Sequence, residues 1–395
     1  MIMDDRTELR SHILRSLGAG GAEIKELLLY NQNLFDRSGL SGMAFPLPDE
    51  AFVRVWEGYA KETEAAGSIL PLRKHLVQLN FPVREGMSGD PGYVAATLSG
   101  EEPGTSPGLG LRAPERCRLF LHPTLAGRIP ILIAGVREDF QLLVQALSKR
   151  NEPAHIPESM GACMIAGYRN WHRIRLLVKV APGAKISERL PDPAVQARLQ
   201  DKSSYQDRFI ILSSGFYSGV PPERFGLSEQ QWREFSLVIR REHECTHYFT
   251  RRVFSSMRNH LMDEMIADYS GIVGAQERFR QDWMLAFLGL ENFPAYTPGA
   301  RLENYRGNPP LSPSAFVILQ RLVKQAAENL ELFDRSTARL FKGGPEKHLY
   351  SLAALSGFTM EELASAQAPA QLHAAFADSA KTLSAGRIPQ SGFVA

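Results

Sequence analysis

Two histidines and a glutamate stand at a spacing that suits metal chemistry. His243, Glu244 and His247 form the pattern H-E-x-x-H, and Glu264 and Asp268 follow as E-x-x-x-D. On a helix, residues four positions apart leave the same face, so both imidazoles can meet one metal ion. Two neutral imidazoles and a carboxylate suit Zn²⁺ and leave a fourth position for water. Glu244 follows His243 directly, where a general base for that water belongs.

The residues around these motifs predict two antiparallel helices. Ser228 is a good N-cap, and Gln231 holds the reciprocal capping-box position three residues later. Apolar residues then recur at near-helical spacing, namely Trp232, Phe235, Ile239, Phe249 and Val253. A second helix is predicted from Asn259, another good N-cap, to about Ile272. Each helix turns its candidate ligands toward a shared point.

The sequence HECTH followed by DEMIAD resembles the zincin metallopeptidases of the gluzincin type. These enzymes take two histidines from H-E-x-x-H and a glutamate from a later helix. The resemblance implies that His243, His247 and Glu264 bind zinc and that Glu244 is the catalytic base. It also implies that Asp268 hydrogen-bonds a ligand histidine, a contact that sets the tautomer and basicity of such a ligand. The match covers only these two helices among 395 residues, so the substrate stays open.

Other polar residues near the motif leave alternatives open. Asp263 or His260 is an alternative third ligand. Tyr248 and His260 are candidates for donating a hydrogen bond to a developing oxyanion. Arg240 belongs to a group of arginines that either forms a solvated face or binds a carboxylate or phosphate of the substrate. This group comprises Arg240, Arg241, Arg251, Arg252 and Arg258.

Composition excludes several classes of protein. A hydrophobic content of 44% with 22% charged residues is typical of globular chains. The net charge of +2 gives no electrostatic reason to expect nucleic acid or a membrane as a partner. Three widely spaced cysteines indicate a reducing compartment rather than a disulfide framework. Because the first residues are polar and contain no apolar signal region, we expect a cytoplasmic protein, of open oligomeric state.

The pattern of apolar and polar residues changes from helical to strand-like and back along the chain, which predicts an α+β fold. We expect a mainly helical region over 1–85, a Gly/Pro-rich loop or linker over 86–114, a zincin-like α/β catalytic domain over 115–290 and a helical region over 291–395. Strands are predicted at 117–122, 129–133, 174–180 and 209–213 from their apolar and branched residues. The resemblance implies that this small mixed sheet packs against the H-E-x-x-H helix.

Three functional hypotheses follow from these residues. The first is a zinc-dependent hydrolase that cleaves an amide or peptide bond. The second keeps the same site but acts on a specific small metabolite, which agrees with the long unmatched chain and the lack of a recognisable pro-segment. The third is a binding protein with a structural zinc, although such sites are usually closed by four protein ligands and rich in cysteine. Imidazole also suits iron, nickel and copper, so zinc is the expected metal without being the only compatible one.

Overall fold

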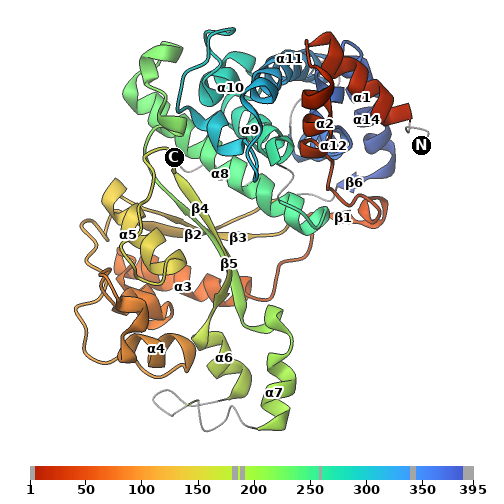
Figure 1. Cartoon of the computed structure of the whole chain (residues 1–395). Helices are drawn as coiled ribbons and strands as arrows, with labels where there is room; N and C mark the ends of the chain where they lie inside the picture. Colours follow the sequence, from red (N-terminus) through yellow and green to blue (C-terminus); the bar gives the residue numbers. More distant parts are fainter. Residues whose placement is uncertain (1–4, 180–185, 187–191, 258–259, 339–343, 386–395) are drawn as a thin grey trace. The chain divides into compact units, whose positions relative to one another are not determined.

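The chain folds into two compact units (Figure 1). The computed structural model describes residues 5–179, 186, 192–257, 260–338 and 344–385. Unit 1 consists of Met1–Leu47, Thr124–Ala126 and Phe216–Ala395, and unit 2 consists of Pro48–Pro123 and Gly127–Gly215. The boundary at 215 falls inside the predicted catalytic range 115–290. The four-stranded sheet and the H-E-x-x-H helix therefore belong to different units, and the expected packing of one on the other stays a prediction.

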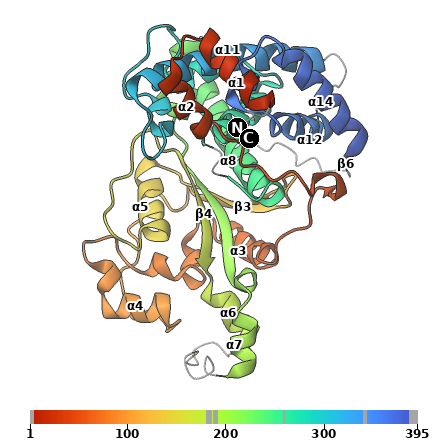
Figure 2. The same cartoon turned by 45° about the vertical axis from the view of Figure 1, so that its right-hand side comes forward.

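Unit 1 is built mainly of helices, which Figure 2 shows from a second direction. Its α-helices are α1 (Asp5–Ser16), α2 (Gly21–Tyr30), α8 (Glu229–Val253), α9 (His260–Gln276), α10 (Gln281–Leu288), α11 (Pro313–Ala338), α12 (Gly344–Leu355), α13 (Met360–Leu363) and α14 (Ala368–Thr382). Its 3-10 helices are η1 (Leu40–Gly42), η7 (Tyr217–Gly219), η8 (Pro222–Phe225) and η9 (Arg301–Tyr305). Two short strands, β1 (Ala44–Phe45) and β6 (Ser384–Ala385), pair in parallel. Helices α11 to α14 lie in the region 291–395 that the sequence predicts as helical.

Unit 2 contains a mixed sheet with the strand order β2-β3-β5-β4. The strands are β2 (Arg118–His122), β3 (Ile129–Ile133), β4 (Ala162–Arg169) and β5 (Gln206–Leu212). Only β3 and β5 are parallel, and the other pairs are antiparallel. The helices are α3 (Val53–Ala66), α4 (Pro91–Leu98), α5 (Arg137–Ser148), α6 (Trp171–Val178) and α7 (Pro193–Leu199), with η2 (Leu70–Lys74), η3 (Val77–Asn80), η4 (Met87–Gly89) and η6 (Lys202–Ser204). The α+β class and the small mixed sheet are thus confirmed.

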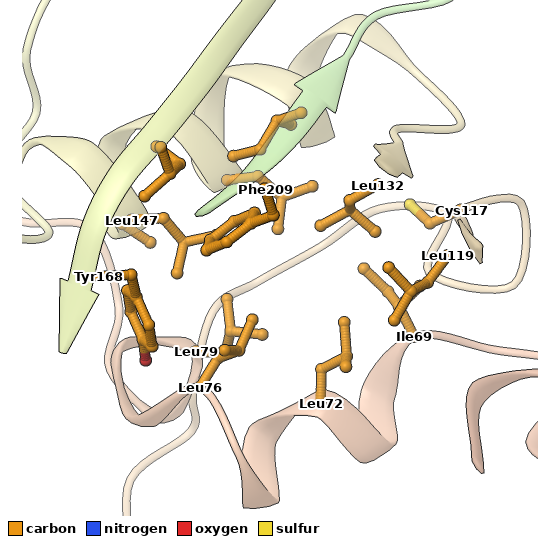
Figure 3. Packing of buried hydrophobic residues seen from close by; sticks show 14 of the residues in the cluster. Ile69, Leu72, Leu76, Leu79, Cys117, Leu119, Leu132, Leu147, Tyr168 and Phe209 are labelled. Atoms are coloured by element: carbon orange, nitrogen blue, oxygen red, sulfur yellow. The ribbon is translucent and has the colours of Figure 1, made fainter. Parts of the chain in front are cut away.

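One face of this sheet carries the core of unit 2. Phe209 of β5 and Leu132 of β3 are fully buried against residues of α3, α5 and the 3-10 segments. Figure 3 shows the two sheet residues facing Leu72, Leu76 and Leu79. Burying a side chain of this size stabilises a fold by about 1.5–3 kcal/mol. This core forms from residues of unit 2 alone.

Two secondary-structure predictions in unit 2 were wrong. The apolar run from Ile174, predicted as a strand, lies in helix α6 up to Val178, and Val180 lies outside the described residues. Asn170 caps this helix by accepting a hydrogen bond from the backbone N–H of Arg173. Trp171, Ile174 and Val178 are buried at helical spacing, so the periodicity of the apolar residues favours a helix despite their β-branched members.

Strand β4 (Ala162–Arg169) was the second miss, since it was not among the predicted strands. It pairs with β5 through a β-bulge between Ala166 and Tyr168, where Gly167 takes a positive φ of 83°. The bulge breaks the alternation of side chains that identifies a strand in sequence. Part of the predicted linker 86–114 is also helical, because Asp90 caps α4 by accepting hydrogen bonds from Gly92 and Tyr93.

Among the described residues, no helix is long and apolar enough to cross a membrane.

Candidate metal centre

Helix α8 carries the H-E-x-x-H motif and begins as the sequence predicts. Ser228 accepts a hydrogen bond from the backbone N–H of Gln231, and the Gln231 side chain accepts one from Ser228 in return, so the capping box is complete. The helix then runs through His243 and His247 without interruption. The predicted N-cap of the second helix, Asn259, lies outside the described residues, and α9 is described from residue 260.

Helices α8 and α9 lie side by side and antiparallel, at close range. Gly271 of α9 stands against the backbone carbonyl of Ile239, because a Cβ at residue 271 would lie 2.7 Å from that oxygen. One turn further along α8, His243 faces Asp268, and another turn on, His247 faces Asp263. The partners advance by four residues at each step along α8 and go back by three and then five residues along α9, as expected where two helices run antiparallel.

Three side chains bring their donor atoms to one point. The Nε2 atoms of His243 and His247 are 3.0 Å apart. Glu264 places Oε2 3.4 Å from Nε2 of His243 and Oε1 3.6 Å from Nε2 of His247. One donor atom from each residue lies within 4.8 Å of the others, and both histidines are buried. This His-His-Glu group could hold a metal ion.

The opposite nitrogen of each imidazole contacts a carboxylate. Asp268 Oδ1 lies 2.9 Å from Nδ1 of His243, the contact that the gluzincin resemblance implies. Asp263 Oδ2 lies 3.0 Å from Nδ1 of His247, so Asp263 supports a histidine rather than standing as a third ligand. A carboxylate accepts a hydrogen bond from Nδ1–H and thereby leaves the Nε2 lone pair directed at the shared point.

Three further residues, which the sequence alone did not single out, complete the surroundings. Tyr217 of η7 donates to Asp268 Oδ1 over 2.7 Å, and Arg301 of η9 pairs with Asp268 Oδ2. Tyr305, also in η9, donates to Glu264 Oε2 over 2.8 Å. These residues lie far from the motif in the chain, and no local pattern marks them.

The electrostatics of the group favour a cation. Burial alone would lower the pKa of His247, but the charges of Asp263 and Glu264 outweigh burial and raise that pKa to about 10. Burial raises the pKa of the Glu264 carboxyl, but the two histidines outweigh it and hold the pKa well below its usual range. Neutral histidines would leave the carboxylates of Asp263, Glu264 and Asp268, all buried or half-buried, against the guanidinium of Arg301. A divalent cation balances that excess, and the donor set of two imidazoles and one carboxylate fits zinc.

Glu244 is half-buried, and its charge contributes to raising the pKa of His247, which places it within electrostatic reach of the group. Tyr248 is fully buried, with its hydroxyl 3.5 Å from Nη1 of Arg252. Arg240 is buried and donates to the carbonyl of Phe216 over 3.1 Å. The His260 side chain and Arg258 lie outside the described part of the chain.

Comparison with known proteins gives a family but no activity. No curated protein matches the chain, and no solved structure matches it. The model of one family matches residues 12–367, which is most of the chain and includes both metal helices. The chain belongs to that family, a family of unknown function (DUF7005).

Proposed function

We propose that this protein is a zinc-dependent hydrolase that cleaves an amide or peptide bond. The observation that carries the proposal is the convergence of His243, His247 and Glu264, with donor atoms within 4.8 Å. A carboxylate on each Nδ1 supports this assignment, because such contacts orient histidines that ligate metals. Hydrolysis also requires a general base for the attacking water, and Glu244, directly after His243, is placed to be that base.

In this proposal each residue has one task. His243, His247 and Glu264 would hold the zinc. When bound, zinc lowers the pKa of a coordinated water to about 7 and polarises a substrate carbonyl. The Glu244 carboxylate accepts a proton from the attacking water and returns it to the nitrogen of the leaving amine. Tyr305 holds one oxygen of Glu264 by its 2.8 Å hydrogen bond, which limits how that carboxylate can turn.

The number of donors favours catalysis over a structural role. Among the described residues, the group offers three protein donors, whereas structural zinc sites are usually closed by four. Nothing in the group separates peptides from a small amide metabolite as substrate. We therefore test the two substrate classes in parallel with the metal.

The test compares Glu244→Gln with Glu242→Gln as its matched control. Both changes remove one carboxylate charge from the same turn of α8, but Glu242 pairs with Arg241 over 2.8 Å. We expect the parent to contain about one equivalent of zinc and to hydrolyse members of a mixed peptide library or a panel of small amides. Glu244→Gln should keep its zinc and lose turnover by about 10²-fold or more, while Glu242→Gln keeps both.

Each other outcome has a definite meaning. Cleavage of small amides without cleavage of peptides assigns the protein to the metabolite class. Zinc binding without hydrolysis of either panel, together with unfolding on chelation, supports a structural zinc. A parent protein that takes up no zinc refutes the metal centre itself.

A further inference from the structure

We propose that turn η9 is a positioning element of the metal centre, in which Arg301 sets the orientation of His243 through Asp268 and Tyr217. This inference rests on the proposed metal site and names residues outside its motif. Arg301 does not touch the shared point of the three donor atoms, so its role is positional rather than catalytic. The argument starts from a closed ring of hydrogen bonds.

The ring joins three residues from three separate segments. Arg301 Nη1 donates to the Tyr217 hydroxyl over 2.7 Å, and that hydroxyl donates to Asp268 Oδ1 over 2.7 Å. Arg301 Nη2 closes the ring on Asp268 Oδ2. The Arg301 side chain is 10% exposed and that of Asp268 is 1% exposed. Charge-assisted hydrogen bonds shielded from water are stronger than neutral, solvated ones, so this ring holds the Asp268 carboxylate in one plane.

The ring determines the proton position on His243. Asp268 Oδ1 is 2.9 Å from Nδ1 of His243, and the Tyr217 oxygen is 3.0 Å from the same nitrogen. The single proton of Tyr217 goes to Asp268 Oδ1, because an ionised carboxylate oxygen 2.7 Å away can only accept, while a lone pair of the hydroxyl oxygen accepts from Arg301. Both oxygens near Nδ1 therefore act as acceptors. His243 must carry its proton on Nδ1, and its Nε2 lone pair points toward His247 and Glu264.

The same turn also reaches a ligand directly. Tyr305 stands four residues after Arg301 and donates to Glu264 Oε2 over 2.8 Å. The two side chains of η9 thus contact two residues of α9, Asp268 and Glu264, that are themselves four positions apart. One turn of η9 thereby controls the orientation of a ligand and of a ligand's partner.

Helix α2 anchors this turn at two points. The Tyr30 hydroxyl donates to the backbone carbonyl of Tyr305. Glu26 accepts hydrogen bonds from the backbone N–H and the hydroxyl of Ser312 over 2.6 and 2.7 Å. These contacts fasten the chain on both sides of Gly307. This glycine has a positive φ of 85°, and a Cβ added there would lie 3.3 Å from the Tyr30 ring, so a larger residue would be strained. The turn is therefore held in place independently of the metal.

The experiment measures zinc affinity by competition with a chelator of known strength, which requires no substrate. Tyr217→Phe removes one hydroxyl from the ring. Arg301→Lys keeps a positive charge next to Asp268 but lacks the planar pair of nitrogens by which Arg301 reaches Tyr217 and Asp268 separately. Glu303→Gln is the control, because it changes a half-exposed residue of the same turn that pairs with Arg306. We expect both ring variants to lose zinc affinity by on the order of 10–100-fold and the control to bind like the parent.

A second readout separates positioning from loss of fold. With Co²⁺ in place of Zn²⁺, the visible absorption reports ligand geometry, so it should shift in Tyr217→Phe and Arg301→Lys and stay unchanged in Glu303→Gln. The thermal midpoint of the metal-free proteins shows whether a variant is folded. Ring variants that are folded and bind zinc as tightly as the parent, with its cobalt spectrum, overturn the inference.

Failure of this inference and failure of the proposed function would give different experimental results. A parent that binds zinc but hydrolyses nothing contradicts the hydrolase and leaves the positioning role open to this test. A parent that hydrolyses amides while the ring variants match its zinc affinity contradicts only the positioning role. A parent without zinc affinity contradicts both.

Discussion

A tight contact between helices α8 and α9 offers a precise way to disturb the candidate metal centre. At Gly271 an added Cβ would lie 2.7 Å from the backbone oxygen of Ile239 and 2.9 Å from its Cγ2. The first distance is about 0.7 Å short of the 3.4 Å at which ordinary contacts begin. A backbone carbonyl inside a helix cannot turn away, so Gly271→Ala must push α8 and α9 apart.

Two opposing contributions determine how much Gly271→Ala changes the free energy of unfolding. Replacing glycine by alanine within a helix stabilises it by about 0.5–1 kcal/mol. Forcing an extra methyl group into a packed interior costs about 1–3 kcal/mol. We expect a net loss of stability of about 1–2 kcal/mol for Gly271→Ala. The functional effect should be larger, because Gly271 lies two turns from Glu264 on the same face of α9, and ligands must be held to within about 0.5 Å.

Gly274→Ala provides the matched control on the same helix. Its new Cβ would meet Cγ of Glu242 at 2.7 Å, a side-chain atom that can move by rotation about the Cα–Cβ bond, whereas the Ile239 oxygen is fixed in the helix backbone. We expect Gly274→Ala to lose less thermal stability than Gly271→Ala and to keep the zinc affinity of the parent. Gly271→Ala should lower the midpoint and weaken zinc binding at least tenfold. Equal midpoints and equal zinc affinities in the two variants would refute the argument from helix contact.

Three other predictions concern buried polar groups. Asp263→Ala should weaken zinc binding by on the order of 10–100-fold in a chelator competition, because it removes the partner of His247 Nδ1. Arg173→Met should destabilise unit 2 by about 3–5 kcal/mol in chemical denaturation, since it leaves the fully buried Asp207 carboxylate without its 2.5 Å ion pair. Burial lowers the pKa of His75 below 6.5, so the unfolded chain binds more protons in acid and stability falls as pH drops below about 6.5. A melting series from pH 7.5 to 5 should show a shallower loss in His75→Gln.

Local signals were enough to locate the His-His-Glu group. The capping box of Ser228 and Gln231 marks the start of α8 within one residue, because both partners of the cap lie within one turn. His243 and His247 share a face through helical spacing alone. Glu264 then follows from its place on the next helix. The structure brings these three residues together as the spacing predicts.

Spacing alone left Asp263 open as an alternative third ligand, because it does not say which of the two nitrogens of an imidazole a neighbour contacts. Asp263 is about 100° around α9 from Glu264. His247, however, offers Nε2 toward Glu264 and Nδ1 toward Asp263, so consecutive residues of α9 contact opposite sides of one ring. Glu264 and Asp263 can therefore point in directions about 100° apart and still contact the same histidine, because the ring separates its two nitrogens.

Strand β4 and the partners of Asp268 depend on contacts that no local pattern encodes. Gly167 breaks the alternation of β4, and only pairing with β5 identifies the segment as a strand. Tyr217 and Arg301 stand 51 and 33 residues from Asp268, and each reaches it from a 3-10 turn. Such turns carry no periodic signal. Their place beside the motif follows from the packing of unit 1 as a whole.

The metal centre therefore extends over much more of the chain than its motif. The three donor residues lie on α8 and α9, but the turn that we propose to orient them is fastened by Tyr30 and Glu26 of α2, which stand 275 and 286 residues from their partners in the chain. Each anchor secures backbone atoms of the segment that holds Arg301 and Tyr305. Loss of α2 packing would free that segment while leaving every ligand in the sequence. Precise ligand placement depends on such supporting contacts. We therefore expect zinc affinity to fall when the packing of α2 is disturbed, even though the motif is unchanged.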